Sequence, residues 1–254
     1  MNRFKIESTP EACARSLCDS HVVKMVLEEG QMLSTVHRVV DGREFIGKTK
    51  TGRNQKQWVL PDRREKSLYK ACHVNHPCTV WARETVGNYK WAFRFFDAVA
   101  KEYTWRYGRD HMTHDKLNWL LKNPPCKINR SLELTPFPLA MGAAPYCIDE
   151  ENPIQSYRDY YWSKRDNFDM VWTKREQPSW FKSTKRFRMA ELAHYYGQTV
   201  EEKHDVSMGA LLNGYIDRLL DGTEDTPAED MERRLRSKDP LDSIRTQYVE
   251  GEDY

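Results

Sequence analysis

The sequence predicts a mainly α protein, and three observations carry that prediction. Apolar residues recur at helical spacing across 19–37, and a second long segment, 78–107, carries a wide apolar surface. Gly108 and the run Asn123-Pro124-Pro125 then supply helix-ending signals. We expect a single helical domain over 1–182 with a short N-terminal strand or hairpin. An acidic helical extension with a mobile tail is expected over 183–254.

The first elements follow from local signals. Phe4-Lys5-Ile6 is predicted as a short strand, and Ser8 with Glu11 fits a capping box that begins a helix over 11–17. The segment 41–58 contains two glycine turns and is predicted as a loop or hairpin. The remaining expectations are helices over 60–73, 78–107, 111–123, 154–164, 188–196 and 207–220, with an irregular, lid-like segment over 124–147.

Charge is distributed unevenly along the chain. Residues 183–254 hold 10 Lys and Arg against 16 Asp and Glu, which leaves 30 against 22 in residues 1–182. A basic body suggests an anionic partner, DNA or a nucleotide, although the excess of eight charges does not establish one. No apolar run approaches the length of about 18 residues that a membrane helix needs. The N-terminus carries no secretion signal, so we expect a cytosolic protein with reduced cysteines.

The helix predicted over 19–37 carries a narrow polar stripe. At 100° per residue, Lys24, Glu28, Gln31 and Thr35 fall beside His21 within about 80°, and apolar residues cover most of the remainder. Buried ionisable groups must be paired or functional, so the stripe is interpreted as the wall of a cleft. An ordinary solvent-facing Lys–Glu pair remains the alternative.

The segment after this helix matches a phosphate-loop pattern, Gly42 followed after four residues by Gly47-Lys48-Thr49. The context is poor, because the preceding segment is predicted as a helix whereas the motif requires a strand. A basic flap that touches a phosphate backbone is the favoured interpretation. The Cys and His residues near 13–21 and 72–78 have irregular spacing, so we expect no metal site and no cofactor.

Four sequence blocks are distinctive: Asp19-Ser-His-Val-Val-Lys-Met, Asn75-His-Pro, Glu102-Tyr-Thr-Trp-Arg-Tyr-Gly and Tyr157-Arg-Asp-Tyr-Tyr. Together they resemble a family of mostly uncharacterised proteins from tailed bacteriophages. The resemblance covers about 1–182 and implies a phage protein of the host cytoplasm with an enzyme-like set of polar residues. A looser analogy links it to glycosylase-like phage enzymes of pyrimidine hypermodification, in which an amine or amino acid displaces pyrophosphate from a hydroxymethyl pyrimidine.

The leading hypothesis is therefore an enzyme of DNA or nucleotide base modification, a transferase or a glycosylase-like enzyme. The proposed catalytic residues are His21, Lys24, Glu28 and Gln31. Residues that combine aromatic or amide groups with cations are assigned to substrate or phosphate: His76, Trp81, Arg83, Asn88, Arg106, His111, Tyr157, Arg158 and Lys164. The stripe is expected to share its cleft with Arg83, Arg106 and Arg158. A non-enzymatic nucleic-acid or host-protein binding module and a phosphate-loop kinase or NTPase remain alternatives.

Overall fold

The computed structural model describes residues 2–49 and 51–182, together with positions 184, 187, 188, 190, 191 and 194. The chain divides into two units, Met1–Glu191 and Leu192–Tyr254. The predicted helix over 207–220 lies outside the described residues, and the one over 188–196 lies there for the most part. The predicted domain boundary after residue 182 lies nine residues before the division between these two units. The helical structure expected for the extension remains a prediction.

The described part is mainly α-helical, which confirms the predicted fold class. Its helices and strands, in chain order, are α1 (Pro10–Ser16), α2 (Asp19–Asp41), β1 (Arg43–Lys48), β2 (Asn54–Val59), α3 (Arg64–Ser67), α4 (Pro77–Ala82), α5 (Val86–Tyr107), α6 (Met112–Leu121), the 3-10 turn η1 (Pro145–Cys147) and α7 (Pro153–Trp162). The two strands form one antiparallel hairpin. No helix in this part of the chain is long and apolar enough to cross a membrane.

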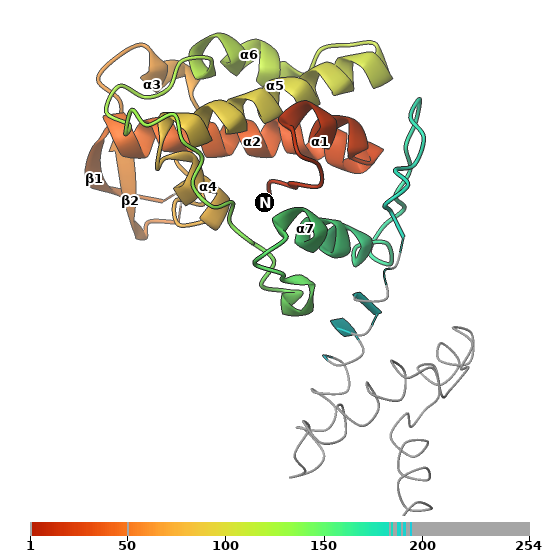
Figure 1. The fold of residues 1–254 in the computed structure, drawn as a ribbon. Helices are drawn as coiled ribbons and strands as arrows, with labels where there is room; N and C mark the ends of the chain where they lie inside the picture. Colours follow the sequence, from red (N-terminus) through yellow and green to blue (C-terminus); the bar gives the residue numbers. More distant parts are fainter. Residues whose placement is uncertain are drawn as a thin grey trace, which may run out of the picture. The chain divides into compact units, whose positions relative to one another are not determined.

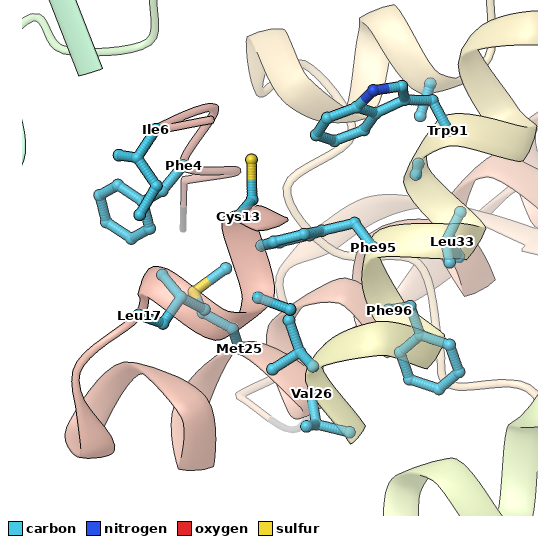
Figure 2. Packing of buried hydrophobic residues seen from close by; sticks show 14 of the residues in the cluster. Phe4, Ile6, Cys13, Leu17, Met25, Val26, Leu33, Trp91, Phe95 and Phe96 are labelled. Atoms are coloured by element: carbon cyan, nitrogen blue, oxygen red, sulfur yellow. The ribbon is translucent and has the colours of Figure 1, made fainter. Parts of the chain in front are cut away.

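The core forms where α2 and α5 lie side by side with α1 and α6 packed against them (Figure 1). Met25, Val26 and Leu33 of α2 face Phe95 and Phe96 of α5 in this layer (Figure 2). Their helical spacing is what allowed both helices to be predicted from the sequence. α5 ends at Gly108, whose φ of 69° is left-handed and suits glycine, as the sequence predicted.

The N-terminal segment runs between α2 and α7 (Figure 1). It is not the predicted strand, because the only β-structure among the described residues is the β1–β2 hairpin. Its side chains are held in the core instead: Phe4 lies 4.8 Å from the ring of His21 and 5.1 Å from the ring of Tyr161. The Ile6 carbonyl accepts a hydrogen bond from Arg158 of α7, at 2.9 Å.

Two helix predictions are corrected by the structure. The predicted helix over 60–73 is only the four-residue α3, because the Arg38 guanidinium binds the carbonyls of Glu65, Leu68 and Tyr69, which bends the backbone out of a helix. The helix predicted over 78–107 is two helices. Thr85 ends the continuity by capping α5, since its side chain accepts a hydrogen bond from the Asn88 amide.

The phosphate-loop interpretation of Gly42–Thr49 is wrong. Residues Arg43–Lys48 are a strand that pairs with Asn54–Val59, in register from Arg43 opposite Val59 to Lys48 opposite Asn54. Backbone amides in an antiparallel ladder alternate in direction and cannot converge on one phosphate. The segment also follows a helix and leads into a strand, which reverses the order that a phosphate loop needs.

Candidate functional site

A small pocket opens between the first half of α2, the N-terminal segment and the end of α7. It has a volume of about 150 Å³. Ten residues line it: Asn2, Phe4, His21, Lys24, Met25, Glu28, Tyr160, Lys164, Asn167 and Phe168. Three of the four proposed catalytic residues are therefore brought together, and Lys164 joins them from a segment 140 positions after Lys24. Ionisable side chains of the predicted stripe therefore line a cavity in the structure.

His21 forms the inner wall of the pocket and is 6% exposed. Its Nδ1 lies 2.7 Å from the hydroxyl of Tyr161, and its ring stands 5.2 Å from Phe168. Burial, together with the positive charges of Lys24 and Lys164, lowers the pKa of His21 to about 3. The imidazole is therefore neutral near pH 7, and it enters any reaction as a hydrogen-bonding group or a base rather than as a cation.

Glu28 and Lys24 supply opposite charges one turn apart on α2. The Lys24 Nζ lies 3.2 Å from the Glu28 Oε1, and the side chain of Lys24 is 62% exposed whereas that of Glu28 is 11% exposed. Lys164 adds a second cation, with its Nζ 3.9 Å from the centre of the Tyr160 ring. The pocket thus holds one sheltered carboxylate, two ammonium groups and a neutral imidazole, a set suited to proton transfer and to stabilising developing charge.

A buried ion pair stands directly behind this set. Glu29, the neighbour of Glu28, accepts hydrogen bonds from Arg3 at 2.6 and 3.1 Å, and neither side chain is exposed. Arg3 also donates to the Cys78 carbonyl at 3.0 Å. These bonds tie the N-terminal segment to α2 and α4, so they fix Asn2 and Phe4 at the pocket. Arg3 and Glu29 are 26 positions apart, and no local pattern in the sequence predicts their pairing.

The rest of the stripe runs along α2 away from the pocket. Gln31 is half-buried and does not line the pocket. Thr35 is buried and exchanges hydrogen bonds with Cys72, at 3.0 Å to its carbonyl and 3.1 Å from its amide. Val23 and Leu27, expected on the buried side of α2, are 43% and 41% exposed. The polar residues therefore lie along one side of α2 as predicted, but the apolar residues on its other sides are less completely buried than expected.

The arginines expected beside the stripe lie elsewhere. The side chain of Arg106 is fully buried and binds Glu102 and Asp19, each at 2.8 Å. Burial alone would raise the pKa of Glu102, yet hydrogen bonds from Arg175 and Arg106 lower it. Arg158 binds Glu7 at 2.9 Å. These guanidinium groups hold segments of the fold together, and neither belongs to the residues that line the pocket.

The candidates around α4 also make internal contacts. Arg83 donates to the Val74 carbonyl at 2.8 Å. His76 caps α4, and burial with neighbouring positive charge lowers its pKa to about 4. Asn88 is buried and binds the Trp81 carbonyl at 2.8 Å, while the Trp81 indole donates to the Thr135 carbonyl at 3.2 Å. These bonds support the irregular segment after α6, so Trp81 and Asn88 lie within the packed interior.

Two further candidates have structural contacts of their own. His111 caps α6, and burial lowers its pKa. Tyr157 is buried and donates to the Pro138 carbonyl at 2.7 Å. Conversely, Asn2, Phe4, Tyr160, Asn167 and Phe168 line the pocket and were not proposed from the sequence. The position of Tyr160 four residues before Lys164, on the aromatic and basic α7, was the available signal.

Comparison with known proteins gives one result. Residues 1–115 match the model of a family described as pyrimidine dimer DNA glycosylase. This is less than half of the 254-residue chain, and it contains all of α2, hence His21, Lys24 and Glu28. No curated protein and no solved structure gave a match. At a coarse level the match agrees with an enzyme that acts on pyrimidines in DNA, and it does not distinguish a glycosylase from a transferase.

Proposed function

We propose that this protein is an enzyme that acts on a pyrimidine nucleotide in DNA and that its reaction takes place in the pocket between α2 and α7. One observation carries the proposal. The segment that resembles a pyrimidine dimer DNA glycosylase family contains α2, and α2 places Glu28, Lys24 and His21 in one pocket. The small volume of about 150 Å³ suits a single sugar or base turned out of the duplex.

The charges of the pocket fit cleavage of a glycosidic bond. When the bond between C1′ of the deoxyribose and N1 of the pyrimidine breaks, its electron pair leaves with the base and positive charge develops on the sugar. The sheltered carboxylate of Glu28 would stabilise that positive charge and accept a proton from attacking water. Lys24 and Lys164 lie at the pocket and would balance the negative charge on the departing base or on the flanking phosphates.

The experiment is a single-turnover assay on a duplex oligonucleotide that carries one cyclobutane thymine dimer. Abasic product is measured as strand breaks after alkali, with an undamaged duplex of the same sequence beside it. Glu28→Gln keeps the shape of the side chain and removes its charge, and we expect its rate to fall by about 100-fold or more. Glu151→Gln, at an exposed position, is the matched control and should keep the wild-type rate. A wild-type rate in Glu28→Gln would contradict the assignment.

A transferase is the second candidate, favoured by the two lysines beside one carboxylate. In this hypothesis the protein is a phage enzyme that attaches an amine or amino acid to a pyrophosphorylated hydroxymethyl pyrimidine in DNA. The new C–N bond forms as the C–O bond to pyrophosphate breaks. Glu28 takes the proton that the amine loses, and Lys24 and Lys164 bind the leaving pyrophosphate.

The two reactions give different products from one panel of substrates. Mass spectrometry of nucleosides from the activated hydroxymethyl pyrimidine duplex, incubated with an amine, would show the added amine. A phosphate assay of the reaction solution after pyrophosphatase treatment would show the released pyrophosphate. Loss of a modified base from the DNA of a phage that lacks this gene would support the same reaction in the cell. Salt-dependent DNA binding without product on either substrate would instead support a non-enzymatic binding module.

A further inference from the structure

The β1–β2 hairpin has no evident part in building the core. Every residue of β1 is exposed except Gly47, which is half-buried, and Ile46 is 62% exposed. In β2 the first three residues are exposed, and only the last three, from Gln57 to Val59, are half-buried. A two-stranded ribbon is marginal on its own in water, so an exposed one of this kind is more readily explained by a partner than by packing.

The hairpin carries a strong positive charge. Residues 43–59 contain five Lys and Arg against one Glu, a balance of +4. Between the hairpin and the segment after α3 there is a second pocket, of about 310 Å³, whose walls include Lys48, Lys56, Lys70 and Trp58. Three cations from three separate segments therefore converge around one hollow, with an aromatic ring beside them.

Nearby carboxylates only partly neutralise these lysines. Lys56 pairs with Glu44 at 2.9 Å and remains 66% exposed, and Lys70 pairs with Glu65 at 2.9 Å and remains 80% exposed. The other oxygen of Glu65 is bound by the buried Arg38, so that carboxylate is shared between two cations. An ammonium group has three donors, so each exposed lysine retains donors for a phosphate oxygen.

This second pocket lies along the same face of α2 as the first. Thr35 belongs to the polar stripe of His21, Lys24 and Glu28, and it binds Cys72, which directly follows the pocket residues Lys70 and Ala71. Lys24 and Thr35 are eleven positions apart, which is about 16 Å along a helix. Nucleotides of one DNA strand follow each other at about 3.4 Å, so this distance spans about five nucleotides.

We infer that the hairpin surface, formed by Lys48, Lys56 and Lys70, binds backbone phosphates of a DNA duplex about five nucleotides from the target base. The inference depends on the proposed function only for the identity of the partner as DNA. The target nucleotide enters the pocket at the first half of α2, and the flanking duplex runs parallel to α2 and passes outside Cys72, which covers the buried Thr35, to reach the hairpin. These contacts are to phosphates, so they hold the duplex in place without reading its sequence.

The test measures binding and not turnover. The affinity of the full chain for a fluorescein-labelled 20-base-pair duplex is followed by anisotropy between 50 and 200 mM salt. For the triple variant Lys48→Gln, Lys56→Gln, Lys70→Gln we expect the slope of log K against log salt to become shallower by about 2.7, at about 0.9 for each lost phosphate contact. Lys48→Gln alone should account for about 0.9 of that change.

The control variant changes three exposed lysines on α5 and at the end of α6: Lys90→Gln, Lys101→Gln, Lys122→Gln. The two triples are matched in charge and in exposure, and each contains an ion-paired lysine, Lys101 with Asp97 and Lys56 with Glu44. The control should keep the wild-type slope. Equal slopes in wild type and hairpin variant, equal losses in both triples, or no duplex binding by the wild type would each overturn the inference.

A footprint separates this inference from the proposed function. Hydroxyl-radical protection of the wild type should extend about five nucleotides to one side of the target, and the hairpin variant should lose that side only. Glu28→Gln should keep the full footprint and the full salt slope while it loses product formation. An inactive wild type that binds with the expected footprint would thus refute the reaction and leave the hairpin contact in place.

Discussion

The two halves of α2 carry the same kinds of ionisable side chain in different surroundings. In the first half, His21, Lys24 and Glu28 face a pocket. In the second half, Arg38 and Asp41 are buried and each is bound by several protein groups. Arg38 bonds three backbone carbonyls of residues 65–69, and Asp41 accepts from the amides of residues 126 and 127 as well as from Arg64.

Histidines show the same contrast between the two halves. Because a guanidinium only donates, Arg64 donates to the Nδ1 of His37 at 3.0 Å, and the Nε2 of the neutral ring then donates to the Tyr89 hydroxyl at 2.7 Å. His21 has the Tyr161 hydroxyl on its Nδ1 and also lies against the pocket. His37 also lines a pocket, of about 530 Å³, but both of its ring nitrogens are bound by protein groups. A cavity alone therefore does not separate the two histidines. They differ because His21 shares its pocket with Lys24 and Glu28, whereas His37 is held between Arg64 and Tyr89.

The largest expected effect separates the two halves by stability. Arg38→Met removes a fully buried guanidinium and leaves the carbonyls of Glu65, Leu68 and Tyr69 without its hydrogen bonds, so we expect the free energy of unfolding to fall by about 3–5 kcal/mol. Lys24→Met, at a side chain that is 62% exposed, should change it by less than about 1 kcal/mol. Urea denaturation monitored by tryptophan fluorescence measures both. Similar losses in the two variants would remove the distinction between a structural and an open half.

The next effect concerns the pH dependence of stability. Burial lowers the pKa of His37 to about 4, whereas an unfolded histidine titrates near pH 6.5. Between these values the unfolded chain binds more protons than the folded one, so stability falls as the pH falls, by up to about 1.4 kcal/mol per pH unit. His37→Gln should reduce this slope between pH 6 and pH 5 in urea denaturation. An unchanged slope would show that His37 is not held neutral in the fold.

Helical periodicity in the sequence was enough to predict α2, α5 and most of α6 and α7, because apolar spacing is a local property. It failed over 60–73, where the backbone carbonyls are bound by Arg38, 27 to 31 positions away in the chain. It failed again for the arginines. Arg106 and Arg158 resemble phosphate ligands beside their aromatic neighbours. The carboxylate partner of Arg158, Glu7, lies 151 positions away. Arg106 binds Glu102 one turn away and also Asp19, which lies 87 positions away.

Local sequence patterns also predict only one wall of the candidate site. The stripe places His21, Lys24 and Glu28 on one face by arithmetic on the helix, and the structure finds all three at one pocket. The opposite wall, with Tyr160 and Lys164, depends on how α7 packs across the N-terminal segment. The ring contact of Phe4 with Tyr161 and the bond from Arg158 to Ile6 set that packing, and neither is a local pattern.

The smallest expected effect tests why Lys24 and Glu28 stand together. If the pair served stability, a double-mutant cycle of Lys24→Gln and Glu28→Gln would show strong coupling in the free energy of unfolding. Lys24 is 62% exposed, so the pair is largely screened by solvent on the lysine side. Pairs one turn apart on a helix contribute only about 0.3–0.5 kcal/mol, and we expect coupling of that size. The same cycle measured on product formation should show a much larger coupling, because both groups act on one substrate. Coupling above about 2 kcal/mol in unfolding, with none in product formation, would make the pair a structural element like Arg38 and Glu65.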